Sequence, residues 1–98
     1  MGIDTNKIKV IHNTSSSRFE AGIGKELAVL EYHLTGKVMA ITHTEVPASL
    51  EGQGIASQLA QSAFEYAREK SYRVIPACEF IVVYLKKHPE YTDLVEGY

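Results

Sequence analysis

Apolar and polar side chains alternate along the first half of the chain in the pattern typical of β-strands. Short clusters of Thr, Ser, Gly and Lys separate these runs and predict turns. Strands joined by such short turns pair antiparallel. The sequence therefore predicts an antiparallel meander of four strands: Lys7–Asn13, Arg18–Ile23, Leu27–Leu34 and Val38–Val46.

The last two of these strands carry predictions about burial. In the third, one face is expected to lie in the core: Ala28, Leu30, Tyr32 and Leu34. The fourth has apolar residues on both faces, which is typical of a central strand covered on both sides. Strict alternation would place one set of its residues on a single face: Met39, Ile41, His43 and Glu45.

The second half of the chain begins with a change of period from two to 3.6 residues, which predicts an amphipathic helix from Ile55 to Lys70. A short strand, Tyr72–Ile75, follows and is ended by Pro76. Because a strand, a helix and a strand come in this order, we expect the two strands to pair in parallel through a right-handed crossover. The sheet is thus predicted to be mixed.

The segment Cys78–Lys87 is β-rich in composition, but its start after a proline and its basic end favour a helix, which is the interpretation we adopt. The remaining residues, Pro89–Gly97, are expected to form a tail with one short turn around Tyr91–Val95.

Length and composition limit the kind of protein this can be. A chain of 98 residues with 45% hydrophobic residues suits one domain, 1–98, with a modest core. The formal net charge is −2 with both signs interspersed, so we expect no nucleic-acid partner and no anionic membrane partner. The longest apolar run, Phe80–Leu85, is too short to span a bilayer, and the first residues do not resemble a signal peptide. We therefore expect a cytoplasmic protein.

Metal and disulfide chemistry is not predicted. The chain has one cysteine, Cys78, which excludes an internal disulfide and a cysteine-cluster zinc site. The histidines His12, His33 and His88 lack the spacing of a metal site.

The stretch Val46–Ala56 joins the fourth strand to the helix and contains Gly52 and Gly54. Glycines just before a helix allow a tight turn that aims unpaired N–H groups outward from the helix start. Together with the helix dipole, these groups can bind phosphate without Lys or Arg. The stretch lacks the Gly-Lys-Ser/Thr ending of a P-loop and the third glycine of a dinucleotide fingerprint. By themselves, the glycines fit either a simple turn or an anion site.

Several short motifs resemble those of one known family, the GNAT superfamily of N-acetyltransferases. Gly54 and Ala56 match the Arg/Gln-x-x-Gly-x-Gly/Ala signature that follows a central strand in these proteins, although Glu51 stands where Arg or Gln is usual. Three further segments are similar to the small single-domain acetyltransferase-like proteins of the superfamily: His43-Thr44-Glu45-Val46, Pro76-Ala77-Cys78, and Tyr84 with His88-Pro89-Glu90-Tyr91. The resemblance covers the chain from about Arg18 to Leu94.

This resemblance implies an α/β fold with a GNAT-like mixed sheet, in which an antiparallel meander precedes a βαβ acetyl-CoA-binding unit and a C-terminal helix. It implies that the backbone of Val46 binds the pantetheine arm where the sheet splays. It also implies a set of residues whose amides bind the CoA pyrophosphate: Gln53, Gly54, Ile55, Ala56 and Ser57.

The resemblance further implies chemical roles for four side chains. His43 would take a proton from the amine acceptor, and Glu45 would orient His43 or take the proton instead. Tyr84 would protonate the CoA thiolate as it leaves. Cys78, at a helix start that favours a thiolate, would either carry the acetyl group covalently, with His43 facing it across the splay, or serve as a small buried side chain while the amine attacks acetyl-CoA directly.

The expected function is acetyl transfer from the co-substrate acetyl-CoA to an amine of a small molecule or a protein. Longer GNAT proteins shape the acceptor site with further strands and a helix pair, so here the acceptor is either small or bound with the help of a partner protein. The alternative is a non-catalytic acyl-CoA-binding or interaction module, which Glu51 and the missing acceptor elements favour.

Overall fold

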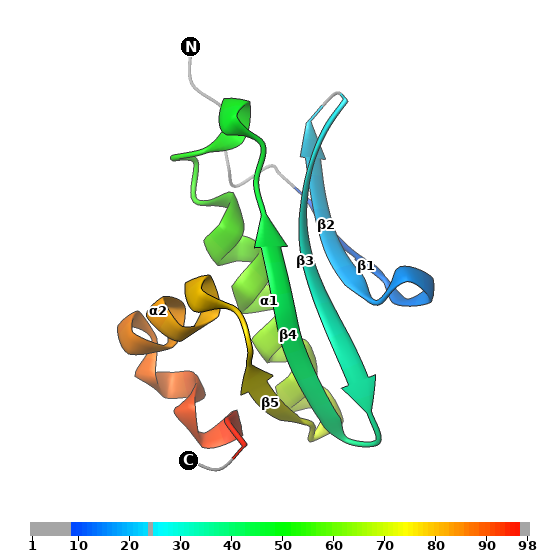
Figure 1. Cartoon of the computed structure of the whole chain (residues 1–98), viewed down its shortest axis with the longest axis vertical. Coiled ribbons are helices and arrows are strands. Elements are labelled where there is room, and N and C mark those ends of the chain that lie inside the picture. Colours follow the sequence, from blue (N-terminus) through cyan, green and yellow to red (C-terminus); the bar gives the residue numbers. More distant parts are fainter. Residues whose placement is uncertain (1–8, 24, 97–98) are drawn as a thin grey trace.

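In the computed structural model, which describes residues 9–23 and 25–96, five strands form a single sheet (Figure 1). They lie side by side in chain order: β1 (Val10–Asn13), β2 (Arg18–Ile23), β3 (Glu26–Thr35), β4 (Val38–Glu45) and β5 (Arg73–Pro76). The strands β1 to β4 pair antiparallel, and β5 pairs parallel with β4. The predicted meander and mixed sheet are confirmed.

Two α-helices complete the fold of the described residues. The helix α1 (Ile55–Lys70) links β4 to β5 and packs along the sheet, with the predicted bounds (Figure 1). The helix α2 (Glu79–Lys87) and the 3₁₀ helix η4 (Pro89–Leu94) follow β5 and contact α1, where Phe64 stacks with Tyr84 and Tyr91. The helical interpretation of Cys78–Lys87 is confirmed, because Ile81, Tyr84 and Leu85 recur at helical spacing and are all buried.

The face of the sheet that packs against α1, called here the inner face, carries the core. Its buried side chains are Phe19, Ala21, Ala28, Leu30, Tyr32, Met39, Ile41 and Val74. Leu34 was expected among them but is 37% exposed near the end of β3. The helices thus cover only part of the inner face.

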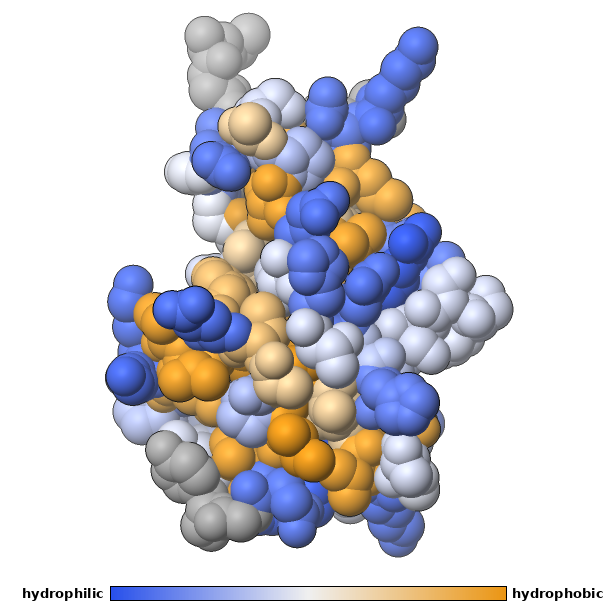
Figure 2. Space-filling model, viewed as in Figure 1, coloured by the Kyte–Doolittle hydropathy of each residue, from blue (hydrophilic) through white to orange (hydrophobic). Residues whose placement is uncertain are grey.

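The opposite, outer face is open. It carries the half-buried Ala40 of β4 and the 40% exposed Ile75 of β5. In Figure 2 this face is in view, and apolar surface gathers over β5 and α2. The prediction that β4 is covered on both sides is therefore wrong, because no helix of the described chain packs on the outer face.

A β-bulge interrupts the pairing of β3 with β4. Tyr32 pairs with Ile41, but the preceding residue of β3, Glu31, pairs with His43. Thr42 is therefore an extra residue in β4. An insertion of this kind reverses the alternation of side chains beyond it.

The reversal changes which β4 side chains face the core. Leu30, which is fully buried on the inner face, pairs with Thr44, so Thr44 points inward. His43 and Glu45 point to the outer face. The prediction that they share a face with the inward-facing Met39 and Ile41 is wrong, because it assumed a strand without a bulge.

Both ends of the described chain differ from expectation. β1 begins at Val10, whereas a strand from Lys7 was predicted; Lys7 and Ile8 lie outside the described residues. The expected tail is mostly the helix η4, and its Tyr91, Leu94 and Val95 are buried. Gly97 lies outside the described part.

Candidate active site

The loop between β4 and α1 presents the start of α1 to solvent. Gly52 and Gly54 have φ angles of 80° and 77°, in the left-handed region that glycine adopts without strain. Gly54 is the N-cap of α1, and because glycine has no side chain, no side-chain hydrogen bond caps the helix here. A Cβ at either glycine would meet no other part of the described protein within 4 Å, so the space above this backbone is open.

This geometry suits an anion. The N–H groups of the first helical turn, at Ile55, Ala56 and Ser57, have no acceptor within the helix, and the helix dipole adds positive potential at the same place. No acidic side chain lies in that first turn. Ile55 is buried, whereas Ala56 is half-buried and Ser57 is exposed, so a phosphate could approach the amides of Ala56 and Ser57 most closely.

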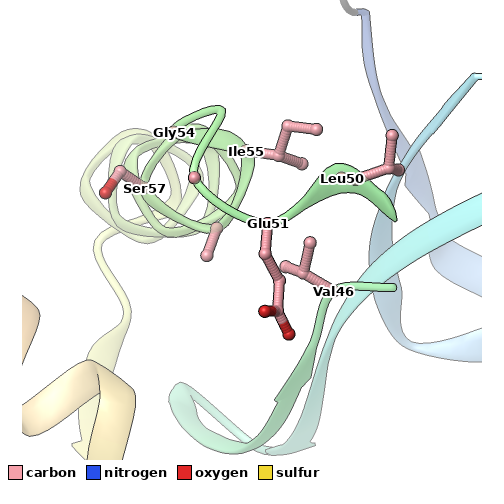
Figure 3. A pocket seen from close by; sticks show the side chains of 8 residues that line it. Val46, Leu50, Glu51, Gly54, Ile55 and Ser57 are labelled. Atoms are coloured by element: carbon pink, nitrogen blue, oxygen red, sulfur yellow. The ribbon is translucent and has the colours of Figure 1, made fainter. Parts of the chain in front are cut away.

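A cavity of about 150 Å³ opens beside the helix start (Figure 3). It is lined by Val46, Leu50, Glu51, Gly52, Gly54, Ile55, Ala56 and Ser57. Five of the six residues predicted to bind the co-substrate are thus together here, while Gln53 is not part of the lining. Sequence reasoning missed Leu50, whose only signal is an apolar side chain in a polar loop.

Glu51 is the side chain least suited to a phosphate site. In Figure 3 its carboxylate extends away from Gly54 and Ser57. The residue is exposed, so water screens its charge. The carboxylate therefore does not occupy the position that a phosphate on the helix amides would take.

The splay implied by the resemblance is visible between β4 and β5. Their pairing ends where Ile41 meets Pro76, and the Ala77 amide makes the last bond, 3.0 Å to the Ile41 carbonyl. β4 continues to Glu45, while the segment that follows β5 turns into α2 (Figure 1). The β5 side of the last β4 residues is thus left without a strand partner in the described chain, and an extended ligand could pair with this edge.

His43 and Glu45 lie together on the outer face beside this splay. The His43 Nε2 is 3.3 Å from the Glu45 Oε1. Both side chains are more than half exposed. The pair can hold the imidazole in one orientation and can exchange a proton with a molecule on the outer face.

Cys78 lies on the other side of β4. It is the N-cap of α2 and half-buried, and its Sγ donates a 3.7 Å hydrogen bond to the Thr44 Oγ1. Thr44 points inward and His43 outward, so the expected arrangement in which His43 faces Cys78 is wrong. The physical reason is again the bulge at Thr42.

Tyr84 lies deeper, six residues after Cys78 along α2. Its side chain is only 4% exposed and stacks on His88, with ring centroids 4.2 Å apart, and on Phe64 at 5.9 Å. Burial, with the negative charges of Glu90 and Glu65, raises the pKa of Tyr84 to about 12. The phenol therefore keeps its proton at neutral pH.

Across residues 9–23 and 25–96, no three His, Cys, Asp or Glu side chains gather closely enough to hold a metal ion. None of the helices in this part of the chain is long and apolar enough to cross a membrane.

Comparison with known proteins gives three findings. The family model described as GCN5-related N-acetyl-transferase matches residues 18–94. Protein NATD1 of Xenopus tropicalis is 32% identical over 88 residues, which are 87% of this chain and 81% of that protein; mouse (Mus musculus) NATD1 is 33% identical, over 84% and 77%. The solution structure of a GCN5-like protein from Staphylococcus aureus superposes with a TM-score of 0.74 at 28% identity, covering 93% of this chain and 90% of that one.

Proposed function

Because this chain belongs to the GCN5-related N-acetyltransferase family, we propose that it transfers an acetyl group from acetyl-CoA to an amine. Members of the family use acetyl-CoA as the co-substrate. The observation that carries the proposal for this chain is the open start of α1, where Gly52 and Gly54 leave the first helical amides accessible beside a cavity.

In this proposal the backbone holds the donor. The amides from Gly54 to Ser57 bind the pyrophosphate, and the free edge of β4 up to Val46 pairs with the amide groups of the pantetheine arm. Neither contact needs a cationic side chain. The arm would then deliver the acetyl group to the splay between β4 and β5.

On the direct route, the amine approaches from the outer face. His43, held by Glu45 at 3.3 Å, takes the proton that the amine must lose before it attacks. Tyr84, which is protonated at neutral pH, gives a proton to the departing CoA thiolate, although its raised pKa makes it a weaker acid than an exposed tyrosine. The exposed position of the His43–Glu45 pair suits an acceptor larger than a buried pocket would hold.

On the covalent route, Cys78 receives the acetyl group first. His43 points to the opposite face, so it is not the group that takes the proton from this thiol. The proton would pass to solvent, which reaches the half-buried Cys78. The two routes therefore use different residues and can be separated by substitution.

The first test is binding. Titration with acetyl-CoA should move the amide resonances of residues 53–57 more than the rest of the spectrum. If these resonances do not move at millimolar acetyl-CoA, the proposed donor site is wrong.

The second test is turnover with a panel of amines and peptides. His43→Ala should lower the rate roughly ten- to a thousandfold on the direct route, as expected for loss of a general base. His33→Ala is the matched control, because His33 is an exposed histidine that pairs with Ala40 on the same outer face. Cys78→Ala should abolish turnover only on the covalent route.

A non-catalytic acyl-CoA-binding or interaction module remains the second candidate function. The open outer face favours it, because no helix of the described chain encloses an acceptor there. This second function would be supported if the protein binds acetyl-CoA but transfers acetyl to none of the tested amines and carries no acetyl group by mass spectrometry. The proposed enzymatic activity would then be wrong.

A further inference from the structure

Thr44 owes its position to the bulge in β4. With regular alternation from Ile41, residue 44 would point to the outer face. The extra residue Thr42 turns Thr44 inward, opposite the buried Leu30. Its hydroxyl thereby meets the Cys78 sulfur at 3.7 Å, just where β4 and β5 separate.

We propose that Thr44 is a positioning residue that holds the Cys78 sulfur at the splay and stabilises its thiolate by donating a hydrogen bond to it. The inference deepens the proposed function and rests on it in one respect, namely that the splay receives the acetyl-bearing arm. It identifies the group that assists Cys78 on the covalent route in place of His43.

The hydroxyl can serve both protonation states of the sulfur. In the thiol, the S–H group donates to the Thr44 Oγ1. Once the sulfur loses its proton, rotation about the Cβ–Oγ1 bond turns the O–H group toward it, because a hydroxyl is both donor and acceptor. Hydrogen bonds to a charged partner are about twice as strong as neutral ones, so the contact favours the thiolate.

Other groups near the Cys78 sulfur have opposing effects on the stability of its thiolate. The N-terminal end of α2, where Cys78 is the N-cap residue, also favours a negative charge. Glu79, in the first turn of that helix, opposes it. The hydroxyl of Thr44 adds a donor that points at the sulfur and carries no charge of its own.

The resulting step is a thioester exchange. The Cys78 thiolate attacks the carbonyl carbon of acetyl-CoA and forms a new C–S bond. The C–S bond to CoA breaks, and CoA leaves as a thiolate that then takes up a proton. No oxidant or reductant is needed, and the amine acceptor later takes the acetyl group from the sulfur.

Because Cys78 is the only cysteine in the chain, its reactivity can be measured by alkylation of the whole protein. Iodoacetamide at neutral pH, followed by mass spectrometry, gives the rate without acetyl-CoA. Thr44→Val keeps the branched shape and removes the hydroxyl, and it should slow alkylation about five- to tenfold. Thr44→Ser keeps the hydroxyl and should stay within about twofold of the native rate.

Thr42→Val is the matched control. The Thr42 hydroxyl lies in the same bulge but donates to the Glu31 carbonyl and does not contact Cys78. Its removal should therefore leave the alkylation rate unchanged. The inference is overturned if Thr44→Val reacts as fast as the native protein, or if Thr44→Ser is as slow as Thr44→Val. It is also overturned if native Cys78 reacts only as fast as the protein unfolds.

A second arm separates this inference from the proposed function. Incubation with acetyl-CoA alone should acetylate Cys78, more slowly in Thr44→Val by the same factor, with acetyl-CoA affinity unchanged. If the alkylation rates follow expectation but no acetyl group appears, the role of Thr44 toward the sulfur stands and the covalent route fails. Absence of acetyl-CoA binding in the native protein refutes the donor site instead.

Discussion

Replacement of Gly54 by alanine tests the donor site most directly. The φ of 77° and ψ of 12° at this N-cap lie in the left-handed region, which costs a residue with a Cβ about 1–2 kcal/mol. No other part of the described protein lies within 4 Å of the new Cβ, so backbone strain is the whole intramolecular cost. In a domain of this size that strain lowers the melting temperature by about 4–16 °C.

Acetyl-CoA binding should weaken beyond this loss of stability. The added methyl group would enter the open space beside the start of α1, where the pyrophosphate is proposed to bind. We expect a loss of about 1–3 kcal/mol in binding, or roughly five- to 150-fold in Kd. Isothermal titration calorimetry, at a temperature where the variant is fully folded, measures it.

Gly36→Ala is the matched control. Gly36 has a φ of 61°, and a Cβ there also meets nothing within 4 Å, but it lies in the turn between β3 and β4, at the opposite end of β4 from the splay. It should lose similar stability and keep its affinity. If Gly54→Ala binds as tightly as the native protein, the helix start does not hold the pyrophosphate. If Gly36→Ala weakens binding equally, general destabilisation explains the result.

Three further predictions concern charge and pH. Glu51→Gln removes an exposed negative charge from the cavity lining and should tighten acetyl-CoA binding about two- to fivefold at low salt, with no difference at high salt; weaker binding would contradict the electrostatic reading. Burial holds the pKa of Tyr84 at about 12 against the usual 10.0, so the fold favours the protonated phenol. That stabilisation is complete below pH 10 and is lost as the pH rises toward 12. In urea unfolding, the free energy of unfolding of Tyr84→Phe should therefore fall less steeply over this pH range than that of the native protein. Burial lowers the pKa of His12 from its usual 6.5, so the fold favours the neutral imidazole. The resulting stabilisation is fully present above pH 6.5 and is lost as the pH falls through the lowered pKa of the folded protein. The native free energy of unfolding should therefore fall more steeply between pH 7 and 5 than that of His12→Phe, which keeps the ring but loses the 2.6 Å contact with the Tyr32 hydroxyl; parallel curves would exclude this role.

Local patterns predicted the elements well. The bounds of α1 were predicted correctly because its apolar stripe repeats every 3.6 residues and two glycines precede it. The order of the strands followed from short turns in the first half and from the crossover at α1. The loop of the donor site was visible for the same reason, since its glycines, its apolar Val46 and the helix start are neighbours in sequence.

The positions of the reactive side chains depend on contacts between segments. The bulge at Thr42 exists only in the register between β3 and β4, and nothing in the β4 sequence alone shows which residue is extra. That one residue decides that His43 and Glu45 meet on the open face. It also decides that Cys78 has Thr44 as its partner and not His43.

The amino-acid sequence by itself thus determined the strands, the helices and the glycine turn, because each is specified by the period or the backbone freedom of adjacent residues. The tertiary structure alone decided the face on which each β4 side chain lies, the separation of β4 from β5, and the burial that raises the pKa of Tyr84 to about 12. These features arise from pairing and packing between residues far apart in the chain, and a single strand or helix does not encode them.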